Sequence, residues 1–210
     1  MNESFDIPGP AGRLEAILMR PEKDPVAAAV ICHAHPLHGG MMHFKVVFRA
    51  AKALQGQGVA VLRFNFRGVG RSEGVHDHGR GELDDAAAAL DEMQRRFPAR
   101  PLILGGFSFG SAVSLRLGAK DGRAGALFAM GFPVSSLPDM SFLSGIQRPC
   151  LFVQGEHDEF GPKDAVREAA ALVAASSLVI VPGADHFFTD QLDELQGAVG
   201  SWASRRPWEG

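Results

Sequence analysis

The chain has 210 residues, 46% of them hydrophobic, and a formal net charge of −3, and it carries no run of Lys or Arg. This length and apolar content suit one domain over residues 1–210, and the weakly acidic charge argues against a nucleic-acid surface. The sequence MNESFDIPGP lacks the basic and apolar parts of a signal peptide, and no 18-residue apolar run follows, so we expect a cytoplasmic protein without membrane insertion.

Apolar runs and helical periods alternate along the chain. The runs rich in β-branched and aromatic residues predict eight strands, at 5–7, 13–19, 27–32, 59–64, 102–104, 126–130, 151–153 and 178–181. Apolar residues at helical spacing predict helices between the later strands, over 46–54, 83–97, 111–117, 166–173 and 192–202. Most strands from the third onward are nearly continuous apolar runs, as in strands buried on both faces.

This alternation predicts an α/β fold with one mostly parallel, eight-stranded sheet, helices on both of its faces and an antiparallel start. In such sheets ligands bind beyond the carboxyl ends of the strands. We therefore expect the functional residues in the loops that follow the strands. The two cysteines, Cys32 and Cys150, lie within apolar runs and are expected to be buried free thiols.

The segment LILGGFSFGSAV, residues 102–113, is the first candidate for chemistry. Ser108 lies between Gly106 and Gly110, where a predicted strand meets a predicted helix. A tight strand-to-helix turn strains the serine backbone and needs small flanking residues, and it exposes the hydroxyl at a helix N-terminus. A glycine-rich packing turn without catalytic function would have the same local pattern, so the motif depends on its partners.

A serine nucleophile needs a base and an acid that orients the base. In this topology they follow the serine in the order acid, then histidine, on later strand ends. Asp158 lies in QGEHDEFGP after the strand at 151–153, with Glu156 and Glu159 as competing acids, and His186 lies in PGADHFF after the last strand. The order predicts a catalytic triad of Ser108, Asp158 and His186.

An acyl-transfer site also needs backbone N–H groups that stabilise an oxyanion. Phe109 supplies one directly after the nucleophile. The segment CHAHPLHGG, residues 32–40, is placed to supply another, and because Pro36 has no N–H the donor is His35 or Leu37. We favour Leu37, because Pro36 fixes the turn immediately before it.

Clustered histidines raise the alternative of a metal site. His33, His35 and His38 follow one strand, and His76 and His78 form a second group. No CxxC, HExxH or comparable ligand motif accompanies them, so we expect no metal and treat these residues as structural.

The segment NFRGVGRSEG, residues 65–74, contains GxG without the third glycine of a dinucleotide-binding turn. No helix opens directly behind it. We therefore expect no cofactor here but a structural loop in which Arg67 and Arg71 hydrogen-bond to carbonyl groups.

With these segments taken together, the chain resembles an α/β-hydrolase, in particular the small serine esterases without a lid that carry an HPLxGG segment after the third strand. The matching pieces, CHAHPLHGG, FNFRGVGRSEG, GGFSFGS, GEHDEFGP and GADHFF, span nearly the whole chain in the family's order. The resemblance implies a Ser108/His186/Asp158 triad, oxyanion donors at Phe109 and Leu37, and cofactor-free hydrolysis of carboxylic esters.

Only residues 133–149 separate two strands between which many hydrolases of this fold insert a cap, so we expect a minimal cap or none. A shallow pocket favours short-acyl esters, of about two to six acyl carbons, as small-molecule substrates. We expect that pocket to be lined by Met42, Phe107, Phe142 and Phe187.

The same triad would also serve a thioesterase or an acyltransferase, and a hydrolase fold without activity would serve as a binding protein. The residues leave these alternatives open. They also do not distinguish a monomer from a homodimer.

Overall fold

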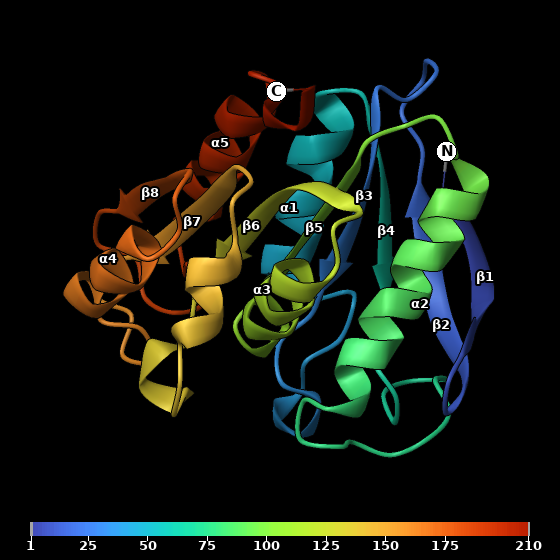
Figure 1. Ribbon diagram of the computed structural model, residues 1–210, viewed down its shortest axis with the longest axis horizontal. Coiled ribbons are helices and arrows are strands. Elements are labelled where there is room, and N and C mark those ends of the chain that lie inside the picture. The colour runs from blue at the N-terminus through green and yellow to red at the C-terminus, as the bar shows by residue number, and fades with distance from the viewer. Residues whose placement is uncertain (1, 210) are drawn as a thin grey trace.

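The structure is a computed structural model and describes residues 2–209. Its centre is one sheet of eight strands in the order β1-β2-β4-β3-β5-β6-β7-β8 (Figure 1). β2 pairs antiparallel with both β1 and β4, and all other neighbours pair parallel. The strands are β1 (Asn2–Gly9), β2 (Gly12–Met19), β3 (Ala27–Cys32), β4 (Val59–Phe64), β5 (Leu102–Phe107), β6 (Ala124–Met130), β7 (Cys150–Gly155) and β8 (Ser176–Val181).

Helices cover both faces of the sheet, which confirms the predicted α/β class. Two of them, α1 (Lys45–Gly56) and α5 (Leu192–Ala203), pack against each other on one face. The other face carries α2 (Gly81–Arg96), α3 (Phe109–Lys120) and α4 (Lys163–Ala171), which lie in front of the sheet in Figure 1. Four short 3-10 helices lie in the loops, η1 (Pro36–His38), η2 (Val134–Ser136), η3 (Ser141–Gly145) and η4 (Pro207–Glu209).

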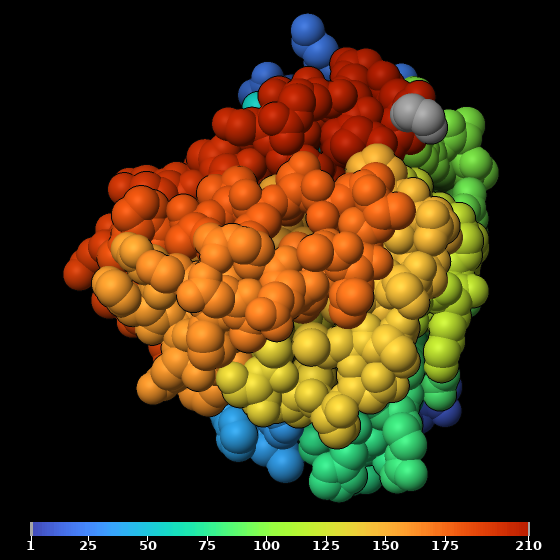
Figure 2. Space-filling view, turned by 60° about the vertical axis from the view of Figure 1, so that its left-hand side comes forward, coloured from blue at the N-terminus to red at the C-terminus, as the bar shows by residue number. Residues whose placement is uncertain are grey.

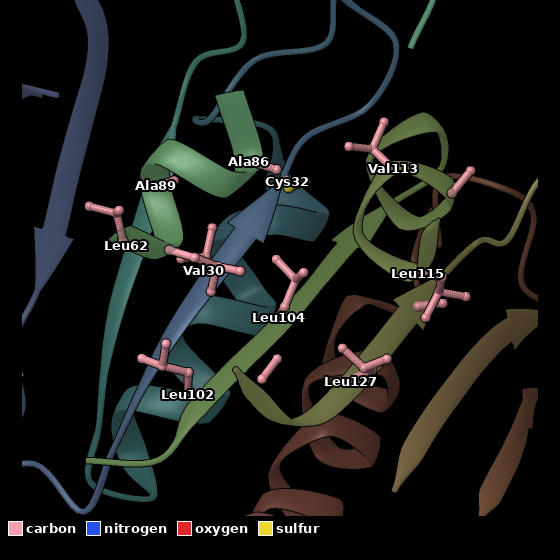
Figure 3. Close-up of a cluster of buried hydrophobic side chains, with 14 of the residues drawn as sticks. Val30, Cys32, Leu62, Ala86, Ala89, Leu102, Leu104, Val113, Leu115 and Leu127 are labelled. Atoms are coloured by element: carbon pink, nitrogen blue, oxygen red, sulfur yellow. The ribbon is translucent and has the colours of Figure 1, made fainter. Parts of the chain in front are cut away.

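The central strands are buried on both sides because apolar side chains point alternately into two cores. Val30, Leu62 and Leu104 face α2 and α3, where they meet Ala86, Ala89, Val113 and Leu115 (Figure 3). The alternate residues of the same strands, such as Ile31 and Ile103, face α1 and α5. This burial explains why the strands read as continuous apolar runs. Cys32 and Cys150 are buried free thiols, as expected, and burial raises the pKa of both.

The boundaries differ most from expectation at the strand-to-helix turn. β5 extends beyond residue 104 to Phe107, since Gly106 pairs with Cys32 of β3 and Phe107 with Met130 of β6. α3 then begins at Phe109, directly after Ser108. Glycine at 105 and 106 weakened the strand signal, yet two parallel neighbours hold this backbone in the ladder.

Little chain lies over the carboxyl edge of the sheet. Between β6 and β7 the chain forms only η2 and η3, which confirms the expected absence of a cap. β3 and β4 point toward the lower edge of Figure 1, where the loops that follow them lie. Within residues 2–209, no helix is both long enough and apolar enough to span a bilayer.

A buried ion pair fixes the loop after β4. Arg67 donates from Nε and Nη2 to the two oxygens of Asp85, at 3.0 and 2.8 Å, and its backbone N–H donates to the same carboxylate. The expectation that Arg67 and Arg71 bond to carbonyls is therefore wrong, because Arg71 likewise donates to a carboxylate, that of Glu15. The pair ties the β4 loop to the first turns of α2.

Replacing Asp85 by Ala leaves the Arg67 guanidinium buried without its counter-charge. We expect Asp85→Ala to lower the free energy of unfolding by about 3–5 kcal/mol, measured by urea denaturation. Asp84→Ala is the matched control, because this neighbouring carboxylate is exposed, and its midpoint should stay close to wild type. Equal urea midpoints for Asp85→Ala and Asp84→Ala would contradict the stabilising role of the Arg67–Asp85 ion pair.

Candidate active site

Ser108 occupies a strained turn between β5 and α3. Its φ of 53° and ψ of −123° place it in a region that non-glycine residues rarely adopt. The Ser108 N–H donates to the Met130 carbonyl at 2.9 Å, which holds the turn against the end of β6. The serine side chain is thereby carried beyond the carboxyl edge of the sheet, at the N-terminus of a helix.

The glycines on either side of Ser108 are required by close backbone packing. A Cβ on Gly106 would lie 2.4 Å from the backbone of Gly110, and one on Gly110 would lie 2.4 Å from the His33 carbonyl oxygen. Real Cβ atoms do not approach so closely. The Gly-x-Ser-x-Gly pattern is thus explained by the crossing of β3, β5 and α3 at this point.

The structure brings together the three side chains of the predicted triad. His186 Nε2 lies 2.9 Å from Ser108 Oγ, and His186 Nδ1 lies 2.7 Å from Asp158 Oδ2. Asp158 and His186 are both almost fully buried. The neutral ring that fits this arrangement carries its proton on Nδ1 toward Asp158, which leaves Nε2 to accept from the serine hydroxyl.

The Asp158 carboxylate is held by four groups. Oδ1 accepts hydrogen bonds from the backbone N–H groups of Phe160 and Gly161. Oδ2 accepts hydrogen bonds from Gln154 Nε2 and from His186 Nδ1. Gln154 is fully buried at the end of β7, and its Oε1 accepts the Phe132 N–H. Together these four contacts fix the orientation of the carboxylate.

The competing acids have other partners. Glu156 bonds to Lys163 and to the Gly183 N–H, which lower its pKa, and Glu159 is exposed. Gln154 was not predicted from the sequence, because a glutamine at the end of an apolar strand carries no motif.

Of the two backbone N–H groups expected to stabilise an oxyanion, one is available in the structure and the other is not. Phe109 is the first residue of α3, so its N–H has no partner within the helix. The Leu37 N–H is already used, because it donates to Nδ1 of His35 at 3.2 Å, and the Leu37 side chain is 68% exposed. Among residues 2–209, the His35 N–H forms no hydrogen bond, and His35 lines the pocket that contains Ser108. The geometry thus corrects the preference for Leu37 and favours His35.

The conformation around His35 is fixed by buried His33. Its Nδ1 donates to the Ala34 carbonyl at 2.6 Å, and its Nε2 accepts the Phe66 N–H at 3.0 Å. This pattern requires the neutral ring. Burial lowers the pKa of His33 to about 4. His33 therefore links the loop after β3 to the loop after β4.

A pocket of about 490 Å³ opens over Ser108. Its walls come from the loops after β3, β4, β6, β7 and β8 and from one face of α3. They include Ala34, His35, His38, Gly40, Phe44, His78, Gly79, Ser108, Phe109, Ala112, Val113, Arg116, Pro133, Ser136, Leu137, Pro138, Phe160, His186 and Phe187. The segments near residues 40, 80 and 140 meet at the lower edge of Figure 2. A neighbouring concavity of about 670 Å³ shares Phe44 and Phe187 with this pocket.

Of the four predicted wall residues, only Phe187 lines the pocket. Phe107 is fully buried behind it, with its ring 5.1 Å from that of His186. Met42 belongs to the core, since Asn65 and Arg63 bind its backbone N–H and carbonyl.

Phe142 also lies outside the pocket wall, where it packs against the core and beneath Arg116. Phe160 and Phe44 take the places expected for these side chains. Phe160 was not predicted from the sequence, because its loop shows no hydrophobic periodicity.

No group of three or more His, Cys, Asp or Glu side chains within residues 2–209 is arranged to hold a metal ion. The histidines near the pocket instead contact one another and Phe109. The His35 ring lies 4.5 Å from that of His38 and 4.8 Å from that of His76. Burial, followed by the neighbouring histidines, lowers the pKa of His35.

Comparison with known proteins gives a consistent result. Residues 27–198 match the family model described as alpha/beta hydrolase domain. A structure from Coxiella burnetii, an alpha-beta serine hydrolase homologue, is 37% identical, with a TM-score of 0.88 over 95% of this chain and 96% of that one. A serine hydrolase without a lid from Xanthomonas campestris is 34% identical, with a TM-score of 0.86 over 97% and 94% of the two chains.

A more distant structure shares the fold. Est1E from Butyrivibrio proteoclasticus, solved with ferulic acid bound, is 19% identical, and its TM-score is 0.87 over 96% of this chain and 98% of that chain. The likeness in fold therefore extends over the whole sheet and its helices.

The buried neutral ring of His33 makes stability depend on pH. Because its folded pKa of about 4 lies below the unfolded value of about 6.5, the stabilisation is complete above pH 6.5 and is lost as pH falls toward 4. We expect a loss of about 3 kcal/mol over this range, measured by urea unfolding at several pH values. His33→Gln, which does not titrate, should show a smaller loss, and an equal loss would contradict the assignment.

Proposed function

Because the chain belongs to the alpha/beta hydrolase family, we propose that it is a serine carboxylesterase that hydrolyses short-acyl esters through an acyl-enzyme. The observation that carries this proposal is the position of His186, whose ring lies within hydrogen-bond distance of both Ser108 Oγ and the Asp158 carboxylate. A serine hydroxyl becomes a useful nucleophile only beside such a base. A hydrolase activity in general is also supported by the two similar structures described as serine hydrolases, which are more than 30% identical to this chain.

In the first step, Ser108 Oγ attacks the ester carbonyl while His186 Nε2 takes its proton. The new Oγ–C bond gives a tetrahedral intermediate, and Asp158 stabilises the imidazolium that forms. His186 then gives the proton to the leaving alcohol oxygen as the ester C–O bond breaks. The product is the acyl-enzyme on Ser108.

In the second step, a water molecule takes the place of the alcohol. His186 Nε2 accepts a proton from the water, and the hydroxide attacks the acyl carbonyl. Collapse of the second intermediate breaks the bond to Ser108 Oγ, which recovers its proton from His186. The acid leaves, and the site is restored.

We propose that the N–H groups of Phe109 and His35 bind the negative oxygen in both intermediates. The partial positive charge at the N-terminus of α3 adds to the donation from Phe109. His35 is favoured because its N–H is free, whereas that of Leu37 is taken. Each such donor contributes about 3 kcal/mol to the lowering of the barrier.

The open pocket supports small substrates. Its volume is about 490 Å³, and only η2 and η3 lie between β6 and β7 where a cap would be inserted. Short acyl chains fit such a site, whereas a long chain would extend into solvent and bury little of its surface.

A fluorophosphonate probe and an ester panel test the proposal together. We expect the probe to label wild type but not Ser108→Ala, and we expect hydrolysis of 4-nitrophenyl acetate and butyrate to exceed that of octanoate and palmitate. Ser111→Ala is a matched control, because it also removes one serine hydroxyl. Ser111 lies in the first turn of α3, and its hydroxyl donates to the Ser108 carbonyl. Absence of labelling would favour a binding protein, a maximum at palmitate would contradict the size argument, and a strong preference for acyl-CoA would favour a thioesterase.

The His35 donor is tested by removing its N–H. His35 has φ −54° and ψ 123°, which proline adopts without strain. We expect His35→Pro to lower kcat by about 10²–10³-fold relative to His35→Ala, which loses the same ring but keeps the N–H, with little change in KM. Equal kcat values for the two variants would show that the His35 N–H is not an oxyanion donor and would favour the N–H of Leu37 instead.

A further inference from the structure

The described wall of the active-site pocket contains one arginine and no carboxylate. Among the described residues that line it, there is no Asp or Glu, whereas Arg116 and several histidines are present. The acid of the triad, Asp158, is buried behind His186 and saturated by its own hydrogen bonds. Arg116 is therefore the permanent charge that the described pocket wall presents to a substrate, and no carboxylate lies in that wall.

Arg116 lies on the face of α3 that forms the pocket wall. It follows Ser108 by eight residues, which is about 12 Å along the helix axis. Ala112 and Val113 line the wall between the two. Long side chains on an α-helix tend to lean toward its N-terminus, which is the end of α3 where Ser108 lies.

The Arg116 guanidinium forms no salt bridge with a carboxylate of the described residues. Most arginines of the described chain pair with a carboxylate within 4 Å, whereas Arg116 lies over the Phe142 ring, at 5.2 Å from the centroid. The nearest acid, Asp139, is exposed and accepts the N–H and hydroxyl of Ser141. Those bonds, and to a smaller extent Arg116, lower the pKa of Asp139.

Stacking on Phe142 orients the guanidinium without using its N–H groups. Arg116 is half-buried, so a charge held there is partly shielded from water. A guanidinium group carries a positive charge in proteins and offers only hydrogen-bond donors. Arg116 is thus a fixed, permanent positive charge whose fork of donors is unoccupied.

A second wall of the pocket is also built to carry polar groups. Glu82, fully buried at the start of α2, accepts the N–H groups of Asp77 and Gly79 and so holds the loop that contains His78. His78 has a φ of 52°, in the left-handed region, and lines the pocket. Strain of this kind persists where the surroundings hold the backbone, as Glu82 does here.

We propose that Arg116 is a specificity-determining residue that binds a carboxylate on the substrate, at the end remote from the scissile ester. The substrate class is then the half-esters of dicarboxylic acids, in which one carboxyl is esterified and the other is free. A carboxylate matches the planar fork of the guanidinium and can accept two parallel hydrogen bonds from it. This inference rests on the proposed esterase function and narrows it.

Paired substrates test the inference. 4-Nitrophenyl hydrogen glutarate carries the free carboxylate on the acyl side, and 4-nitrophenyl pentanoate is its neutral counterpart. We expect wild type to prefer the charged ester by at least tenfold in kcat/KM, and we expect the preference to shrink as salt is added. Arg116→Gln should reduce the ratio of the two kcat/KM values at least tenfold, mainly through KM, and Arg116→Lys should retain part of it.

Lys120→Gln is the matched control. It removes one positive charge from the exposed end of the same helix, outside the pocket, and it should leave the ratio as in wild type. A second pair of substrates tests a carboxylate on the alcohol side of the ester. These are butyl esters whose alcohol either carries a terminal carboxylate or lacks it.

An equal rate on charged and neutral esters in both pairs would overturn the inference, as would an unchanged ratio in Arg116→Gln. In either case fluorophosphonate labelling of Ser108 and hydrolysis of the neutral esters would leave the esterase proposal intact. Absence of labelling would instead overturn the esterase function, and this inference with it.

Discussion

The close approach of three backbone segments determines the position and conformation of Ser108, the proposed nucleophile. β3, β5 and α3 cross where a Cβ at Gly106 or Gly110 would lie 2.4 Å from a neighbouring backbone atom. Only glycine permits this crossing, and the crossing forces Ser108 into its positive φ. The serine is therefore held by the main chain and not by its own side-chain contacts, so its hydroxyl is free to face His186.

The other two residues of the proposed triad are held in place by different kinds of contact. Asp158 is held by two backbone N–H groups and by Gln154, whose amide also bonds to the Gly161 carbonyl and the Phe132 N–H. His186 lies among the aromatic rings of Phe107, Phe160 and Phe187, at centroid distances between 4.6 and 5.2 Å. Polar bonds thus orient the acid, while ring packing holds the base and keeps water away from its face.

Features that are local in the sequence could be predicted, and features that depend on packing could not. The apolar runs and the glycines around Ser108 are written in consecutive residues, so the sheet, the turn and the order of Ser108, Asp158 and His186 followed from them. The donor loop is different, because the competition between His35 and Leu37 depends on where the His35 ring points.

The pocket wall was the least predictable part. Met42 and Phe142 are apolar residues in the right segments, yet the Asn65 and Arg63 clamp and the contact with Arg116 direct them elsewhere. Arg116 itself has no signal in the sequence, because a single arginine in a helix is ordinarily a solvated surface residue. Its place over the pocket follows only from the turn that sets the direction of α3.

The central claim is that Ser108 carries the acyl group during turnover. The most direct measurement is intact-protein and peptide mass spectrometry of enzyme quenched in acid while it hydrolyses 4-nitrophenyl butyrate. The account predicts a butyryl group on the peptide that contains Ser108, at higher occupancy than in an unreacted sample and absent in Ser108→Ala. Turnover that depends on His186 but leaves no acyl group on Ser108, or places it on another residue, would contradict it.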